Sequence, residues 1–202
     1  MALTVLEGAS RRLVLDGAAR LFRRDGYAAV SLRAIAAECG MKAGSLYYHF
    51  DSKEVIVVEV LNIGVQRVHA AVAEALAAVS QSAPMARRLD AAIAAHLRAL
   101  HEAGDYTSAN IRIFGQVPPA IRSRHMPVRR AYGDLWTALL RDGVATGALR
   151  REMDVATLRA FLLGAMNSSL EWLMPQNGAV ARVAVELSRL VLDGAAADAR
   201  PV

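Results

Sequence analysis

The sequence has one cysteine, few aromatic residues and few prolines. Cys39 is the only cysteine among 202 residues, which excludes an intrachain disulfide and a thiolate metal cluster. Aromatic residues make up 5% of the chain, whereas hydrophobic residues make up 54%. Arg and Asp interrupt the apolar runs, so no membrane span is expected, and residues 1–12 lack the pattern of a signal peptide. The sequence therefore predicts a soluble cytoplasmic protein.

Enzyme motifs are also missing. There is no glycine-rich phosphate loop and no nucleophile elbow. His96 and His101 are five positions apart, which places them on different helix faces and does not fit a metal pair at i and i+4. Scattered Ser, Asp and His residues carry no weight by themselves. We therefore expect no enzymatic activity, no metal and no cofactor.

Charge is spread rather than concentrated. The chain has 24 basic and 19 acidic residues, a net charge of +5, which is compatible with a polyanionic partner. Residues 1–60 carry eight Lys or Arg and seven Asp or Glu, so this part is nearly neutral. Any attraction to DNA must come from how the charges are arranged, and residues 45–50 contain no acid.

The N-terminal quarter has the pattern of three helices. Apolar residues recur at helical spacing over residues 14–22, with Ser10 as the expected N-cap and Gly26 as the expected stop. A second helix is expected from its N-cap Ser31 to Gly40. The next helix follows so closely that the two must cross steeply, as in a helix-turn-helix.

The third helix presents a face suited to a major groove. Leu46 and Phe50 are spaced to anchor it inward, and Cys39 on the preceding helix is expected to be a small core residue. Tyr47 and Lys53 are expected to contact phosphates or sugars, because DNA-binding proteins grip the backbone with such side chains. The predicted DNA-binding residues are Ser31, Arg33, Lys42, Ala43, Gly44, Ser45, Tyr47, Tyr48, His49 and Lys53. Taken singly, the two tyrosines and the histidine would be ordinary structural residues; their ordered context favours DNA contact.

This stretch resembles the TetR/AcrR family of bacterial transcriptional regulators. The resemblance lies in Ala18-Ala19-x-Leu21-Phe22-x-x-x-Gly26-Tyr27 and Ser31-x-x-x-Ile35-Ala36-x-x-x-Gly40-Met41-x-x-Gly44-x-Leu46-Tyr47-x-His49-Phe50-x-Ser52-Lys53-Glu54. It implies a second, all-helical domain that binds a small effector and dimerises. Lys42 departs from the Ser or Thr that caps the recognition helix in many relatives, and a lysine cannot accept a capping hydrogen bond.

The fold class is therefore expected to be all-α. We expect a helix-turn-helix DNA-binding domain over residues 1–52 and an effector-binding and dimerisation domain over residues 53–202. Ser52 is expected to cap a long helix to about Val79, although residues 55–60 also have the β-branched composition of a strand.

Further helices are expected along the second domain. One runs from Pro84 to about Glu102 and a shorter one from Tyr106 to Phe114. Pro118 and Pro119 mark a break, and Pro127 either kinks or starts the helix that ends near Gly147. Asp154 caps another, Pro175 and Gly178 break the chain, and residues 180–191 form the last helix.

The last two helices have a broad apolar surface. We expect a homodimer interface over residues 154–195, because the resemblance implies a four-helix bundle there and paired recognition helices need a fixed spacing. The alternative is a monomeric bundle that buries this face itself. The predicted interface residues are Leu158, Leu162, Met166, Leu170, Val183, Leu187 and Leu190.

An effector site is expected among the helices of the second domain, residues 53–202. The predicted ligand-binding residues are Leu97, Leu100, Phe114, Arg129, Arg130, Tyr132, Trp136, Leu139, Met166 and Asn167, with ordinary helical core as the alternative. Arg122, Arg124, Arg129 and Arg130 with His125 form an acid-free cluster, which is either a solvated face or a site for phosphates.

The second domain also resembles the TetR branch that senses acyl-CoA thioesters in lipid or steroid breakdown. The resemblance lies in Arg130-x-Tyr132-x-x-Leu135-Trp136 and Leu162-Leu163-Gly164-Ala165-Met166-Asn167. It implies a repressor that binds a palindromic operator as a homodimer and is released by a hydrophobic effector. The alternative is a repressor of an efflux or detoxification gene, induced by a lipophilic drug-like cation; Asp134 and Glu171 are then the candidate counter-charges.

Overall fold

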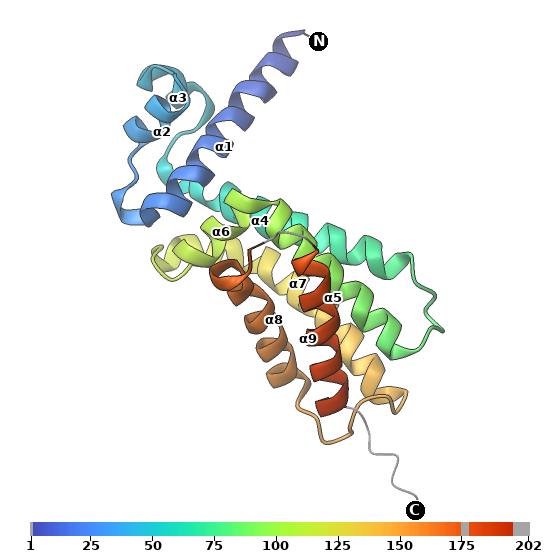
Figure 1. The fold of residues 1–202 in the computed structure, drawn as a ribbon. Coiled ribbons are helices and arrows are strands. Elements are labelled where there is room, and N and C mark those ends of the chain that lie inside the picture. Colours follow the sequence, from blue (N-terminus) through green and yellow to red (C-terminus); the bar gives the residue numbers. More distant parts are fainter. Residues whose placement is uncertain (1, 175–177, 196–202) are drawn as a thin grey trace, which may run out of the picture. The chain divides into compact units, whose positions relative to one another are not determined.

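The computed structural model describes residues 2–174 and 178–195, and in these residues every regular element is an α-helix (Figure 1). The predicted all-α class is confirmed. The helices are α1 (Ala2–Ala29), α2 (Leu32–Glu38), α3 (Ala43–His49), α4 (Lys53–Ala77), α5 (Met85–Glu102), α6 (Gly104–Ile113), α7 (Pro119–Ala145), α8 (Val155–Trp172) and α9 (Ala179–Ala195).

The chain divides into two compact units. The first comprises Met1–Gln66 and Ala103–Arg129, and the second comprises Arg67–Glu102 and Arg130–Val202. The division differs from the expected boundary at residue 52, because α6 and the first part of α7 group with the N-terminal helices. The helices α4 and α7 contribute residues to both units.

The first helix starts earlier than its sequence pattern suggests. Ser10 lies inside α1, so it is not the N-cap, and the prediction of a start after Ser10 is wrong. No proline lies between Ala2 and Ser10, and Gly8 alone costs a helix only about 1 kcal/mol, so nothing in this stretch stops it. The break expected at Gly26 is present: its φ of 80° interrupts the helix, and glycine adopts such an angle without steric cost.

The turn between α2 and α3 follows the sequence closely. The Ser31 hydroxyl accepts a hydrogen bond from the Ala34 amide at 3.1 Å, which confirms Ser31 as the N-cap of α2. Gly40 turns the chain with a φ of 63°. Lys42 precedes α3 and makes no side-chain cap. Cys39 packs partly buried against the core, as expected.

The helix α4 resolves the ambiguity between helix and strand. It is helical throughout, and the Ser52 hydroxyl accepts from the Val55 amide at 3.4 Å. By length and composition α4 is apolar enough to cross a membrane, contrary to the expectation that charges interrupt every such run. Its residues Ile56, Val57 and Leu61 are buried in the core of the first unit, as in a core helix.

The remaining helix boundaries mostly agree with the proline and capping signals. Pro119 starts α7, and Pro127 lies inside it. The Asp154 carboxylate accepts from the Ala156 amide at 3.1 Å, which confirms it as the cap of α8. Gly178, with a φ of 72°, precedes α9; the expected break at Pro175 lies outside the described residues.

Candidate DNA interface and effector site

The recognition helix α3 has one buried side and one exposed side. Leu46 and Phe50 are buried in the core of the first unit, as their spacing predicted. Tyr47 is 57% exposed and Tyr48 is 74% exposed. Of the other predicted DNA residues, Ala43, His49 and Lys53 are partly buried and Ser31, Arg33, Lys42, Gly44 and Ser45 are exposed. The structure therefore leaves polar and aromatic side chains exposed on α3, with no acid on the helix.

Arg11 of α1 holds the end of the recognition helix. Its guanidinium donates to the His49 carbonyl at 2.9 Å, pairs with Glu59 of α4, and lies 4.2 Å from the centre of the Phe50 ring. A cation at a helix C-terminus satisfies a free carbonyl and opposes the helix dipole. Arg11 was not predicted from the sequence, because its partners are 38 and 48 residues away in the chain.

Lys53 is engaged within its own unit. Its ammonium donates to the Tyr27 carbonyl and lies 4.0 Å from the centre of the Tyr27 ring, and burial lowers its pKa. The Tyr27 amide in turn donates to Gln116 at 2.9 Å. Lysine has three N–H donors, so phosphate contact remains our proposal for Lys53, alongside its role of holding the turn before α2.

We expect Arg11→Ala to weaken specific operator binding about tenfold, because the loss of a hydrogen bond and an ion pair frees the end of α3. The slope of log affinity against log salt concentration should not change, since no phosphate contact is lost. Arg12→Ala is the matched control: Arg12 is the exposed neighbour on the same helix, and the change in charge is identical. Fluorescence anisotropy with operator DNA at several salt concentrations measures both quantities. Equal effects of the two substitutions, or a shallower slope for Arg11→Ala, would contradict the positioning role.

The predicted ligand-binding residues fall in both units. Phe114 and Arg129 belong to the first, and the other eight belong to the second. In the second unit, Leu97, Leu100, Tyr132, Trp136, Leu139 and Met166 are buried. His96 was not predicted; it is buried beside them and lies 2.6 Å from the Tyr132 hydroxyl through Nδ1.

Arg129 is the exposed end of a polar chain in the first unit. Its guanidinium lies 4.0 Å from the centre of the Phe114 ring and donates weakly to the Asn110 side-chain oxygen at 3.4 Å. The Asn110 amide nitrogen donates to the carbonyl of Leu61 in α4 at 2.9 Å and lies 3.2 Å from Nε2 of His125. This series of hydrogen bonds connects α7 and α6 to the backbone of α4. Asn110 lies within the expected helix 106–114, but its partners are too distant in sequence for a local pattern to reveal.

His125 completes this chain with a defined proton arrangement. Its Nδ1 lies 2.7 Å from the side-chain oxygen of Asn62, which can only accept, so Nδ1 carries the hydrogen and Nε2 accepts from Asn110. Burial, together with the charge of Arg129, lowers the pKa of His125 to about 4. In the second unit, burial lowers the pKa of His96 to about 4, and the Asn167 side chain acts in the opposite direction.

The lowered pKa values of His96 and His125 predict that the protein loses stability in acid. Their pKa values are lower in the folded chain than in the unfolded chain, so the unfolded state binds more protons between about pH 4 and pH 6.5. The free energy of unfolding should be constant above pH 6.5 and fall below it, by on the order of 3 kcal/mol for each histidine. Urea unfolding at a series of pH values measures this. His125→Gln, which does not titrate, should fall less steeply; an unchanged pH dependence in that variant would contradict the assignment.

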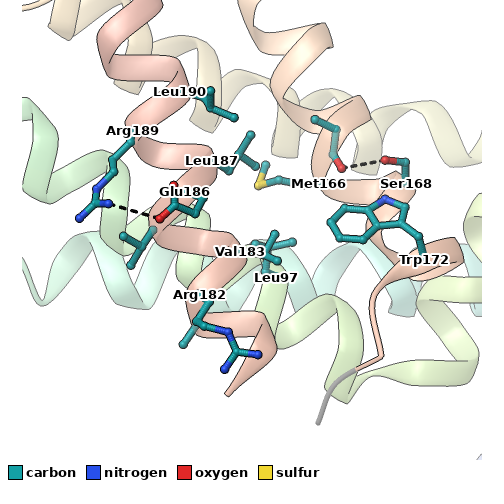
Figure 2. Close-up of a pocket in the computed structure, with 13 residues that line it drawn as sticks. Leu97, Met166, Ser168, Trp172, Arg182, Val183, Glu186, Leu187, Arg189 and Leu190 are labelled. Atoms are coloured by element: carbon teal, nitrogen blue, oxygen red, sulfur yellow. Dashed lines mark hydrogen bonds and ion pairs between the residues drawn. The ribbon is translucent and has the colours of Figure 1, made fainter. Parts of the chain in front are cut away.

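The helices α8 and α9 border an open apolar groove of about 800 Å³ (Figure 2). Its lining includes Leu97, Met166, Trp172 and Leu187. Of the predicted interface residues, Leu162 and Met166 are buried within the chain, Leu158, Leu170, Val183 and Leu187 are partly buried, and Leu190 is 71% exposed. Leu162 is buried by its own chain, whereas Met166, although buried, lines the groove. Phe161 of α8, 79% exposed, was missed and faces solvent.

Comparison with known proteins decides the family. Residues 14–60 match the model for bacterial regulatory proteins of the tetR family, and residues 82–195 match the tetracyclin repressor-like C-terminal domain. The chain belongs to the TetR family. The HTH-type transcriptional repressor KstR2 of Rhodococcus jostii (strain RHA1) is 30% identical over 192 residues, covering 92% of this chain and 91% of that protein.

Solved structures agree with this fold. The TetR family regulator PfmR from Thermus thermophilus has a TM-score of 0.77 and 29% identity, covering 89% of this chain and 93% of that one. AibR, solved in complex with isovaleryl coenzyme A and operator DNA, has a TM-score of 0.76 and 21% identity, covering 90% and 97%. TetR proteins are DNA-binding transcriptional regulators, so the prediction that the chain is not an enzyme is confirmed. Within the described residues, no group of three His, Cys, Asp or Glu side chains is placed to hold a metal ion.

Proposed function

We propose that this TetR protein is a cytoplasmic homodimeric repressor of a palindromic operator. The observation that carries the proposal is the recognition helix α3, which is anchored by Leu46 and Phe50 and leaves Tyr47 and Tyr48 exposed. Lys42, Ala43 and Gly44 stand at the front of this helix, where base edges are reached. Two such helices in adjacent major grooves block transcription.

The homodimer is proposed to form through α8 and α9. Phe161 and Trp172 of α8 and Leu190 of α9 expose large apolar side chains, as does Met174 just after α8. A second copy that packs there buries this surface and fills the groove between the helices. Leu158, Leu170, Val183 and Leu187 remain in the proposed interface.

The effector is proposed to act through α4, the helix that follows the recognition helix. Arg129 reaches the Leu61 carbonyl of α4 through Asn110 alone. An anionic group that draws Arg129 away removes a hydrogen bond from Asn110. Asn110 is the residue that donates to the Leu61 carbonyl, so the contact between α6 and α4 changes. The coupling is reciprocal: operator DNA must weaken effector binding by the same factor.

The effector class we propose is a hydrophobic acyl-CoA thioester of lipid or steroid catabolism, an anion with an apolar chain. In the second unit, Arg130 supplies a cation for its phosphates, and Leu97, Leu100, Leu139 and Met166 supply apolar surface. In the first unit, Arg129 is the arginine proposed to respond to the anionic group. Isovaleryl coenzyme A is bound in the AibR complex. A lipophilic cation is the alternative, but Asp134 and Glu171, the carboxylates considered for it, are exposed.

A gel-shift titration of the operator with acyl-CoA thioesters of increasing chain length tests this proposal. We expect at least one thioester to weaken operator binding by about 5- to 150-fold, the usual range of coupling, while its free acid has no effect. Arg130→Ala should reduce this response and leave effector-free operator affinity intact. Arg129→Ala also removes the hydrogen bond to Asn110, so it should reduce the response and lower the effector-free affinity as well. Arg124→Ala, an exposed arginine on the same helix, is the control. Release by lipophilic cations and by no thioester would contradict the effector class.

A further inference from the structure

Both backbone groups of Tyr27, in the turn between α1 and α2, are bonded to side chains that are distant in the sequence. The Tyr27 amide donates to Oε1 of Gln116 at 2.9 Å, and the Tyr27 carbonyl accepts from the Lys53 ammonium. The helix is interrupted just before Tyr27, where Gly26 has a φ of 80°. An interrupted helix leaves backbone groups that need partners outside the helix, and Gln116 and Lys53 supply them.

Gln116 starts from a fixed position after α6. The backbone amides of Gln116 and Val117 both donate to the Ile113 carbonyl, at 2.8 Å and 3.1 Å. Val117 is buried in the core of the first unit, which also contains α1, α2 and α3. The Gln116 side chain therefore extends from an ordered turn rather than from a loose loop.

The side-chain amide of Gln116 is bonded at both ends. Its oxygen accepts from the Tyr27 amide, and its nitrogen donates to the Arg112 carbonyl at 3.1 Å. Arg112 lies in the last turn of α6, where carbonyls lack the next turn as a partner. Because one partner is a donor and the other an acceptor, only one orientation of the amide serves both. Gln116 thus connects the end of α6 to the turn before α2.

Gly26 leaves the space that the Gln116 side chain occupies. A Cβ at Gly26 would lie 2.9 Å from Oε1 of Gln116, which is closer than real Cβ contacts. Ser31, the N-cap of α2, follows four residues after Tyr27, and α3 follows α2. The direction in which the helix-turn-helix leaves α1 therefore depends on this turn.

We propose that Gln116 is a positioning residue for operator binding, because it holds the turn before α2 against the end of α6. The connection reaches the helix-turn-helix from α1, whereas the one proposed above for the effector reaches it from α4. Gln116 lies in the part of the chain that matches the C-terminal domain of the family, residues 82–195. The inference rests on the proposed operator-binding function, and it adds a residue outside the DNA-contacting surface on which operator affinity depends.

Two substitutions separate the two bonds of the Gln116 side chain. Gln116→Met has a similar length and makes neither bond. Gln116→Glu keeps an acceptor oxygen for the Tyr27 amide but cannot donate to the Arg112 carbonyl. Both variants lose the bond at the end of α6, so a purely structural role there affects them alike. Gln66→Met and Gln66→Glu, at an exposed position of α4 in the same unit, are the matched controls.

NMR of the ¹⁵N-labelled dimer follows the Tyr27 amide, and fluorescence anisotropy with operator DNA measures the affinity. We expect Gln116→Met to move the Tyr27 amide proton upfield and to weaken operator binding about fivefold, as for the loss of one exposed hydrogen bond. Gln116→Glu should keep the amide bonded and the affinity near that of the unsubstituted protein. The Gln66 variants should change neither quantity. Circular dichroism and sedimentation velocity confirm that each variant is folded and dimeric.

Operator affinity is expected to follow the Tyr27 amide across the variants. A variant that loses this bond but binds the operator as tightly as the unsubstituted protein would overturn the inference. So would a variant that keeps the bond but binds weakly, or a Tyr27 amide that does not respond to Gln116→Met. The NMR measurement uses no DNA. A protein with no specific operator loses the proposed function, whereas an operator that all Gln116 variants bind equally well removes only this inference.

Discussion

Leu190→Glu is expected to split the homodimer and to weaken operator binding by at least about 100-fold, because linked binding heads gain two to four orders of magnitude over a single head. Leu190 is 71% exposed on α9, so the single chain tolerates a carboxylate there. A second copy does not, since the charge would be buried against an apolar partner. Phe161→Glu on α8 should act in the same way.

Sedimentation velocity measures the assembly, and anisotropy measures the operator affinity. Ala145→Glu, an exposed position at the end of α7, introduces the same charge and is the control. Leu187→Glu is a poorer test, because Leu187 is partly buried in its own chain whereas Leu190 is exposed. Helicity should survive in every variant. A dimer that persists with both Leu190→Glu and Phe161→Glu would place the interface elsewhere.

Gly64→Ala is expected to destabilise the protein by about 1–3 kcal/mol, the usual cost of overpacking. A Cβ at Gly64 in α4 would lie 2.7 Å from the backbone oxygen of Tyr106 in α6, and a backbone atom cannot turn aside as a side chain can. The two helices must therefore move apart. Since α4 follows the recognition helix and Asn110 of α6 bonds to its backbone, operator affinity should fall with stability.

Gly8→Ala is the matched control for this substitution. Gly8 also lies within a helix, but a Cβ there meets nothing within 4 Å. Alanine is a better helix former, so Gly8→Ala should be neutral or stabilise the protein by up to about 1 kcal/mol. Chemical denaturation of the two variants gives the comparison. If Gly64→Ala were as stable as Gly8→Ala, the close approach of α4 and α6 would be refuted.

The helix-turn-helix could be predicted because its signals are local. Ser31 caps α2, Gly40 turns the chain, and the spacing of Leu46 and Phe50 indicates which side of α3 is buried. Ser10 was misleading, since a good capping residue starts a helix only where the preceding residues do not continue it. Arg11 was missed for a related reason: its partners are distant in the chain, and a pattern within one helix cannot reveal them.

The second domain was less predictable because most of its helices carry an apolar face. Periodicity finds an apolar stripe but does not say which neighbour covers it. Met166 and Leu162 are covered by their own chain, whereas Phe161 beside them is exposed. The buried polar groups of His96, Asn110 and His125 also depend on partners in other helices, which are known only from the fold.

Sequence-specific DNA binding through α3 is the central claim, and footprinting of the DNA upstream of the protein's own gene tests it directly. We predict two protected half-sites related by a palindrome, with centres about one DNA turn apart or slightly more, at physiological salt. Tyr47→Ala should weaken the protection while the protein stays folded and dimeric, since Tyr47 is exposed on α3 and is proposed to contact the DNA backbone. Binding no stronger than to random DNA of the same length, across a library of palindromic sites as well, would contradict the central claim.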